Sequence, residues 1–193
     1  GQNIGRTAAV AAGLPNTVSG MSIDRQCSSG MMAIATAAKQ IIHDQMPITI
    51  GAGLESISLV QNENRNAYRA QDPNVIAKSE HAYMSMLETA ETVSKRYSIS
   101  REKQDEYALQ SQQRTATAQE TGKYDDEIAP LPSKMLFVDK ETKQQSVHDV
   151  NLEKDEGNRP TTTLEGLTGL KPVFEGGVIT AGNASQLSDG ASA

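Results

Sequence analysis

The stretch SIDRQCSSGMMAIATAAKQI, residues 22–41, decides which fold this sequence predicts. Apolar side chains follow Cys27 near helical spacing, so the pattern predicts a helix over residues 27–45. Most of the intervening residues are also small or apolar, which is typical of a helix that is buried on nearly all sides. Pro47 stands just beyond its expected end. We therefore expect a buried helix directly after the cysteine.

Strands are expected on both sides of that helix. Residues 18–23 (VSGMSI) are typical of a short strand that Gly20 weakens, and residues 48–53 (ITIGAG) of a buried strand. A strand, a helix and a second strand of these lengths form a βαβ unit, in which the two strands run parallel. The fold class expected from this part of the chain is therefore α/β.

Residues 61–160 differ in character, because they are polar, charged and irregular. Their patterns predict three elements in order: a helix over residues 86–97, a helix capped by Ser100 and ended near residue 121 by Gly122, and a hairpin over residues 134–150 with its turn near residues 140–143. This stretch is expected to be a folded excursion from the first part of the chain.

Residues 161–193 are again rich in apolar and small residues, like residues 1–60. Leu164, Leu167 and Leu170 predict a short helix, and residues 178–181 resemble a strand that enters a turn. Because the sequence stops within a segment rich in Ala, Ser and Gly, we expect it to be a fragment of a longer protein. The domain organisation expected is a core in residues 1–60, an inserted domain in residues 61–172, and a return to the core in residues 173–193.

Composition argues against several classes of protein. Lys and Arg total 18 against 24 Asp and Glu, a net charge of −6, which argues against a nucleic-acid partner. One cysteine cannot form an internal disulfide, so a reducing compartment is expected. No apolar run approaches the roughly 20 residues needed to cross a bilayer. We therefore expect no membrane partner, and a location in the cytoplasm or, in a eukaryote, in an organelle matrix.

Cys27 is the candidate catalytic residue, because it stands between an expected strand and an expected helix. At the first turn of a helix, unpaired N–H groups favour the thiolate and are placed to hold an oxyanion. The small residues 28–30 leave room for an acyl substrate. A lone cysteine is more often a small buried apolar residue, and this alternative stays open. No metal-ligand spacing is present, and no pairing motif surrounds the three histidines, His43, His81 and His148.

Five stretches together cover most of the 193 residues: SIDRQCSSGMMAIATAAKQI (22–41), GAGLESISL (51–59), MLETAETVSKRYSISREKQDEYALQSQQRTATAQ (86–119), DEGNRPTTTLEGLTGLKPVF (155–174) and GGVITAGNASQLSDGASA (176–193). Taken in this order, they resemble the thiolase family.

This resemblance implies a layered αβαβα fold of two similar halves, with a mostly helical loop domain inserted in the first half. The chain would supply the latter part of the first half and the loop domain. The family's catalytic histidine, its asparagine and a second cysteine belong to the second half, so the resemblance implies that these 193 residues alone are inactive. Family members are dimers or tetramers, which implies a homodimer or homotetramer here.

The resemblance also implies a mechanism and a set of site residues. Cys27 would attack a 3-oxoacyl-CoA and hold the shortened acyl group as a thioester until coenzyme A collects it. Coenzyme A and acyl-CoA would be substrates, and no permanently bound cofactor is expected. The residues that match coenzyme A-contacting or tunnel-lining positions are Arg159 at the nucleotide end, Ser185 on the pantetheine arm, Ala181 and Phe174 along the tunnel, and Met86 over the acyl end. For Arg159, the alternative is an ordinary surface arginine. For Phe174 and Met86, the alternative is ordinary packing in a core.

Two departures bear on which thiolase this sequence resembles. Biosynthetic acetoacetyl-CoA thiolases often have histidine where this chain has Ser85 and serine where it has Gly166. Both favour the degradative 3-ketoacyl-CoA thiolases of fatty-acid β-oxidation over the biosynthetic enzymes that condense two acetyl-CoA. Alternatives of another class are a thiolase-like acyl-CoA-binding protein without turnover, and a plain α/β domain with a structural cysteine.

Overall fold

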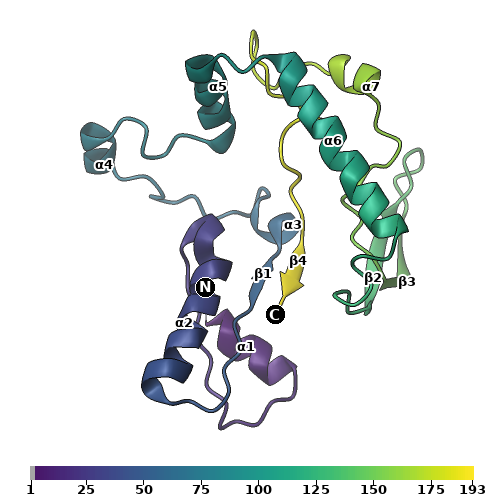
Figure 1. The fold of residues 1–193 in the computed structure, drawn as a ribbon. Helices are drawn as coiled ribbons and strands as arrows, with labels where there is room; N and C mark the ends of the chain where they lie inside the picture. Colours follow the sequence, from purple (N-terminus) through teal and green to yellow (C-terminus); the bar gives the residue numbers. More distant parts are fainter. Residues whose placement is uncertain (1–2) are drawn as a thin grey trace. The chain divides into compact units, whose positions relative to one another are not determined.

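The computed structural model describes residues 3–193 and contains helices and strands (Figure 1). Contacts divide the chain into two compact units. The first unit comprises Gly1–Arg65 and Leu187–Ala193, and the second unit comprises Asn66–Gln186. The chain therefore leaves the first unit after Arg65 and returns to it at Leu187.

The first unit begins with α1 (Ile4–Ala11), which the side chain of Asn3 caps by accepting a hydrogen bond from the N–H of Arg6. Side chains of this helical segment bind the backbone that follows. The Asn3 amide donates to the carbonyl of Gly20 at 2.7 Å, and the Arg6 guanidinium donates to the carbonyl of Val18. These contacts use carbonyls that a strand ladder would otherwise need.

The strand expected over residues 18–23 is consequently absent, and that prediction was wrong. The parallel pair was also wrong. The short strand β1 (Gly53–Glu55) pairs antiparallel with β4 (Gly190–Ser192), and residues 48–52 form no strand. Instead, the Thr49 hydroxyl donates to the carbonyl of Ala37, which ties this segment to a helix rather than to a neighbouring strand.

That helix is α2 (Ser29–Asp44), preceded by the 3₁₀ turn η1 (Gln26–Ser28). A helix was expected here and is confirmed, but the expectation that it is buried was wrong. Met31 is 79 % exposed and Ile42 is 69 % exposed. Within the described residues of the first unit, only η1 and the segment around β1 pack closely on α2, so most of its apolar surface has no cover.

The short helix α3 (Ile57–Val60) fixes the strand pair in place. The N–H of Ser58 donates to the carboxylate of Asp189 at 3.0 Å, and the Ser58 hydroxyl donates to the same carboxylate. These hydrogen bonds hold the pKa of Asp189 below its ordinary value. Because Asp189 immediately precedes β4, the contact holds the end of the chain beside β1.

The second unit contains α4 (Pro73–Lys78), α5 (Met86–Tyr97) and α6 (Arg101–Glu120). The helix expected over residues 86–97 is confirmed. Ser100 caps α6 by accepting from the N–H of Lys103, as expected, and Gly122 follows with φ +69°, a conformation that glycine adopts without strain.

The hairpin expected over residues 134–150 is also confirmed. Strands β2 (Leu131–Val138) and β3 (Gln145–Leu152) pair antiparallel, with Leu131 opposite Leu152 and Val138 opposite Gln145. The Asp139 carboxylate accepts from the N–H groups of Glu141 and Thr142 and so organises the turn.

The last helix, α7 (Leu164–Thr168), confirms the short helix expected from the leucine spacing. Residues 178–181 were expected to form a strand, but that prediction was wrong because side chains take the backbone groups that a strand would pair. The N–H groups of Val178 and Ile179 donate to Glu91, and that of Thr180 donates to Asn183.

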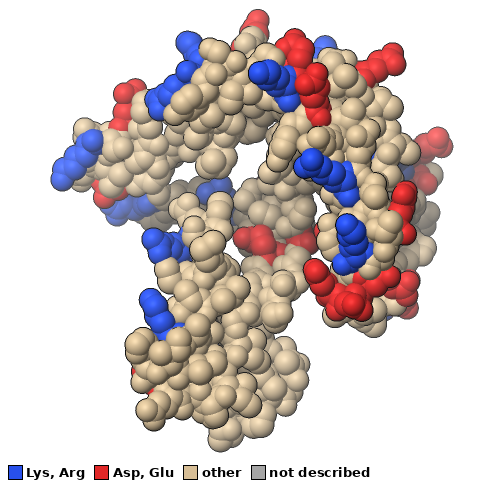
Figure 2. Space-filling model, in the orientation of Figure 1, with Lys and Arg blue, Asp and Glu red and all other residues tan. Residues whose placement is uncertain are grey.

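Surface charge differs between the elements. Figure 2 shows Lys and Arg side chains interspersed with Asp and Glu side chains over the second unit, whereas α1 and α2 present few charges in this view. Among residues 3–193, no helix is both long enough and apolar enough to cross a membrane.

Candidate active site

Cys27 lies in the first unit, in the 3₁₀ turn that leads into α2, and its side chain is exposed. A network of short hydrogen bonds shapes this turn. The Ser29 hydroxyl donates to the carbonyl of Gln26 at 2.6 Å and accepts from the N–H of Arg25 at 2.8 Å. The Asp24 carboxylate accepts from the N–H of Gln26. The chain therefore presents the sulfur, exposed, at a helix start.

The backbone next to Cys27 has two further features. Gln26 has φ +49°, an uncommon conformation for a residue other than glycine. Within the described residues, the N–H of Cys27 donates to no acceptor, so it is available to an oxyanion. A Cβ placed on Gly30 would meet no atom within 4 Å, which leaves open space one turn beyond the sulfur.

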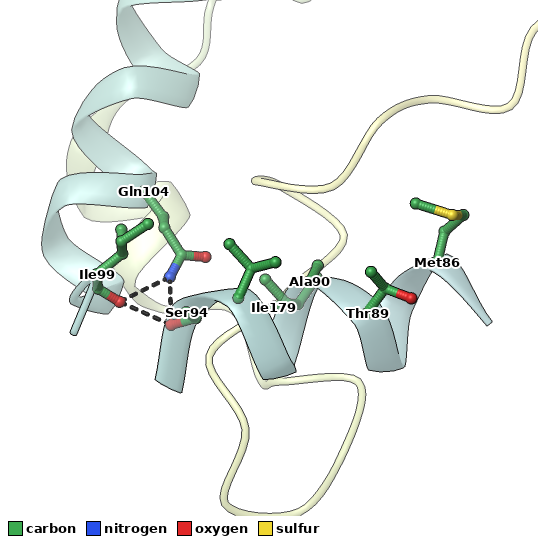
Figure 3. A pocket seen from close by; sticks show the side chains of 8 residues that line it. Met86, Thr89, Ala90, Ser94, Ile99, Gln104 and Ile179 are labelled. Atoms are coloured by element: carbon green, nitrogen blue, oxygen red, sulfur yellow. Dashed lines mark hydrogen bonds between the residues drawn. The ribbon is translucent and has the colours of Figure 1, made fainter. Parts of the chain in front are cut away.

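The second unit contains the other five residues expected at the site. Met86 stands at the start of α5 and lines a shallow hollow of about 290 Å³ with an apolar lining (Figure 3). Ile179 closes one side of this hollow, and at its far end the Gln104 amide donates to Ser94 and to the carbonyl of Ile99. Met86 itself is 74 % exposed, so core packing within this unit does not explain it.

Phe174 lines a different hollow, together with Glu88, Glu91 and the glycines at 176 and 177. Glu91 anchors the chain beyond these glycines, because its carboxylate accepts from two successive N–H groups, those of Val178 and Ile179. A Cβ on Gly177 would lie 2.4 Å from a Glu91 oxygen, so a larger residue at 177 would displace this anchor.

Ala181 and Ser185 flank a tight turn that is organised from inside. Thr180 is fully buried, and its hydroxyl accepts from the N–H groups of Gly182 and Asn183. The Asn183 amide donates to the buried carboxylate of Asp105 at 3.0 Å. Ala181 and Ser185 are themselves exposed, so the turn presents both to solvent.

Arg159 is held by its backbone alone. Its N–H donates to the side-chain oxygen of Gln112 at 2.8 Å, and its carbonyl accepts from the N–H and the hydroxyl of Thr162. Within residues 3–193, the guanidinium makes no hydrogen bond or ion pair. The side chain is exposed and available to a ligand.

Sequence reasoning missed the residues that build this framework, namely Glu91, Asp105, Gln112 and Asn183. In the sequence, Asp105 is simply an acidic residue near the start of the helix that Ser100 caps, where acidic residues are common. Its partner Asn183 lies 78 positions away, and no local pattern connects the two. A buried Asp that pairs with Arg101 at i−4 is recognisable in sequence as a helix ion pair, but not as the support of a distant turn.

Together these features define a protein with an exposed cysteine at a helix start in one unit and, in the other, an organised pair of loops with an exposed arginine and an exposed serine. The family model of the thiolase N-terminal domain matches residues 1–193, the whole sequence. The chain belongs to the thiolase family.

Three similar proteins illustrate this membership. The peroxisomal 3-ketoacyl-CoA thiolase 1 of Arabidopsis thaliana is 45 % identical over 192 residues, which are 97 % of this chain and 42 % of that protein. Human mitochondrial 3-ketoacyl-CoA thiolase in complex with CoA is 33 % identical with a TM-score of 0.74, over 96 % of this chain and 46 % of that one. The dimeric peroxisomal thiolase of Saccharomyces cerevisiae is 32 % identical with a TM-score of 0.79, over 96 % and 45 %.

These comparisons show how much of the similar proteins' length the chain spans, and in which organelles those proteins are found. The chain spans less than half the length of each of the three proteins. Two of them are named peroxisomal and one mitochondrial, so the expected cytoplasmic location is corrected, while the expectation of an organelle matrix is consistent with these names.

Proposed function

We propose that the protein is an acetyl-CoA C-acyltransferase that cleaves 3-oxoacyl-CoA with coenzyme A in fatty-acid β-oxidation. The observation that carries the proposal is the exposed Cys27 at the start of α2, in a chain that the thiolase N-terminal domain matches throughout. The similar 3-ketoacyl-CoA thiolases, and the serine and glycine at positions 85 and 166, support the degradative direction.

In the proposed reaction, the Cys27 thiolate attacks the 3-keto carbon of the substrate. The bond between C2 and C3 then breaks, the electron pair leaves with acetyl-CoA as an enolate, and a proton completes that product. The shortened acyl group remains on Cys27 as a thioester until the thiolate of a second coenzyme A attacks it and releases the cysteine. The free N–H of Cys27 is a donor for the oxyanion of each tetrahedral intermediate.

The second unit would hold the coenzyme, which is a substrate and not a resident cofactor. The guanidinium of Arg159 would stack on adenine or pair with phosphate, and Ser185 would hydrogen-bond the pantetheine arm. Ala181 and Phe174 would line the tunnel for that arm, and Met86 would cover the acyl end. The exposure of Arg159, Ser185 and Ala181 supports these roles.

We also propose the layered αβαβα architecture, with the second unit as its inserted loop domain, and a homodimer or homotetramer as the assembly. The dimeric yeast thiolase supports the assembly proposal. Light scattering on the intact protein tests it, and a monomer would contradict it.

Acyl transfer to Cys27 gives the direct test. Intact protein incubated with acetoacetyl-CoA, with coenzyme A withheld, is expected to carry one acyl group on the peptide that contains Cys27, as measured by mass spectrometry. Addition of coenzyme A is expected to remove it. Cys27→Ala is expected to abolish the adduct and lower thiolysis by about a thousandfold or more. A protein that binds coenzyme A yet never acquires the adduct is a binding protein without turnover, and the proposal is then wrong.

A further inference from the structure

Helix α6 carries a stripe of polar residues that contact segments far away in the sequence. Asp105, Gln112 and Gln119 stand seven positions apart, so about two helical turns, or about 10.5 Å, separate each from the next on one face. Each makes a hydrogen bond across the second unit: Asp105 with Asn183, Gln112 with Asn158 and Arg159, and Gln119 with Asp155. The helix therefore holds its neighbours by hydrogen bonds rather than by an apolar face.

Gln112 makes the densest set of these contacts. Its side-chain oxygen accepts from the Asn158 amide at 2.8 Å and from the N–H of Arg159 at 2.8 Å. Its backbone carbonyl accepts from the same Asn158 amide at 2.9 Å. One glutamine thereby fixes two successive residues of the loop, while the guanidinium of Arg159 stays free among the described residues.

The loop around Arg159 is further tied on its N-terminal side. The Gln119 amide donates to the carbonyl of Asp155 at 2.9 Å, and the Asp155 carboxylate accepts from the N–H of Gly157 at 2.7 Å. The Gln186 amide donates to the carbonyl of Gly157. A loop held at three successive points keeps a defined backbone, so α6 and Gln186 together set the place from which the Arg159 side chain starts.

We propose that Gln112 is a positioning residue that fixes Arg159 for the nucleotide end of coenzyme A. This inference rests on the proposed function, since it needs a coenzyme to position against. Gln112 acts through the backbone of Arg159 and touches no reacting group. Because the two hydrogen bonds to Gln112 define where the guanidinium begins, their loss frees the loop and lowers the fraction of molecules that are ready to bind the nucleotide.

The test compares two acceptor thiols in thiolysis of acetoacetyl-CoA by the intact protein. Coenzyme A carries the nucleotide, whereas pantetheine carries the same thiol arm without it. Gln112→Met removes the side-chain acceptor but keeps length and helix propensity. We expect it to raise KM for coenzyme A about tenfold, to leave kcat within about twofold, and to leave kcat/KM for pantetheine unchanged.

The chain offers a matched control and a rescue. Gln113 is the next residue on the same helix and is exposed, so Gln113→Met is expected to leave both acceptors unaffected. Gln112→Glu keeps an acceptor oxygen at the same distance from the backbone and is expected to return KM for coenzyme A to within about threefold of the natural value.

Three outcomes would overturn the inference. One is a KM for coenzyme A in Gln112→Met that matches Gln113→Met. Another is an equal loss with coenzyme A and pantetheine, which would indicate a purely structural effect. The third is a Gln112→Glu variant as weak as Gln112→Met. Each is distinguishable from failure of the proposed function, because that failure is the absence of an acyl group on Cys27 in the unsubstituted protein.

Discussion

The two units of the chain differ in how composition relates to burial. The first unit is rich in large apolar residues, yet none of its described residues is buried. The second unit is polar and charged, yet it contains every buried residue of the described chain, in the order Ser94, Asp105, Leu167, Ile179 and Thr180. Three of these five are polar, so the more polar sequence forms the better-packed structure.

The difference shows that apolar residues create a core only where elements close around them. In the first unit, α2 meets little besides a 3₁₀ turn and a short strand segment, and Ile34, Ile41 and Ile42 remain exposed. In the second unit, α6 and α7 pack together, and the Arg101 guanidinium donates to the carbonyls of Leu167 and Leu170. Specific hydrogen bonds therefore hold the second unit where hydrophobic area is scarce.

The largest expected effect on this comparison of the two units comes from removing the buried carboxylate of Asp105 in the second unit. Asp105 is fully buried and pairs with Arg101 at 2.7 Å, so Asp105→Ala removes the anionic partner of a partly buried guanidinium and one of the two acceptors of the Asn183 amide. We expect a loss of about 3–5 kcal/mol in the free energy of unfolding of the second unit. Urea denaturation of the 193-residue chain, followed by circular dichroism of its helices, measures the loss.

The neighbouring residue supplies the control for that substitution. Glu106 is exposed on the same helix, and Glu106→Ala is expected to change stability by no more than about 0.5 kcal/mol. If the two substitutions have the same effect, the polar network around Asp105 does not stabilise the second unit.

A smaller effect is expected at the start of α5, where a capping box closes the helix. The N–H of Glu88 donates to the Ser85 hydroxyl oxygen, and the Glu88 carboxylate accepts from the N–H and the hydroxyl of Ser85. Ser85→Ala removes both hydroxyl contacts, so we expect a loss of about 1 kcal/mol at neutral pH. Ser111→Ala on exposed α6 surface is the control and is expected to have little effect.

The same capping box gives a pH dependence of known sign. The hydrogen bonds from Ser85 lower the pKa of Glu88 in the folded state. Because the pKa of Glu88 is lower in the folded chain than in the unfolded chain, its carboxylate stabilises the fold fully at pH values above the unfolded-state pKa. This stabilisation is lost as the pH falls through the folded-state pKa. The difference in the free energy of unfolding between the natural chain and Ser85→Ala should therefore shrink when the pH is lowered below the ordinary pKa range of glutamate. A difference that stays constant or grows would contradict this assignment.

The sequence predicted the elements that local signals define. Ser100 and Gly122 bound α6, and the turn after Val138 gives the hairpin, because caps and turns depend on residues a few positions apart. It also predicted that Cys27 would stand at a helix start, since the apolar run after it requires a helix.

What the sequence could not predict depends on distant partners. Residues 18–23 fail to form a strand because Asn3 and Arg6 take their carbonyls. Residues 178–181 fail because Glu91, far earlier in the chain, takes their N–H groups. The framework of the candidate site has the same origin: Gln112 and Asp105 are unremarkable helix residues until the fold brings residues 158 and 183 to them.

A matched pair of substitutions, one in each unit, gives the sharpest form of the comparison. Ile42 on α2 is 69 % exposed, whereas Leu167 on α7 is 5 % exposed. Both are large aliphatic residues in helices, and both are truncated in the same way by alanine. Leu167→Ala should destabilise the second unit by about 2–5 kcal/mol, because it leaves a cavity against Gly182 and the chain around it.

Ile42→Ala should change stability by no more than about 0.5 kcal/mol, and the better helix propensity of alanine offsets part of any lost contact. Amide hydrogen exchange on the 193-residue chain reports α2 and α7 separately, so each substitution is read in its own unit. Equal losses would mean that α2 is covered in solution, for example by self-association of the chain through its apolar residues, and the contrast between the two units would then disappear. A large loss at Leu167 beside none at Ile42 would establish that burial, and not apolarity, decides which residues hold this chain together.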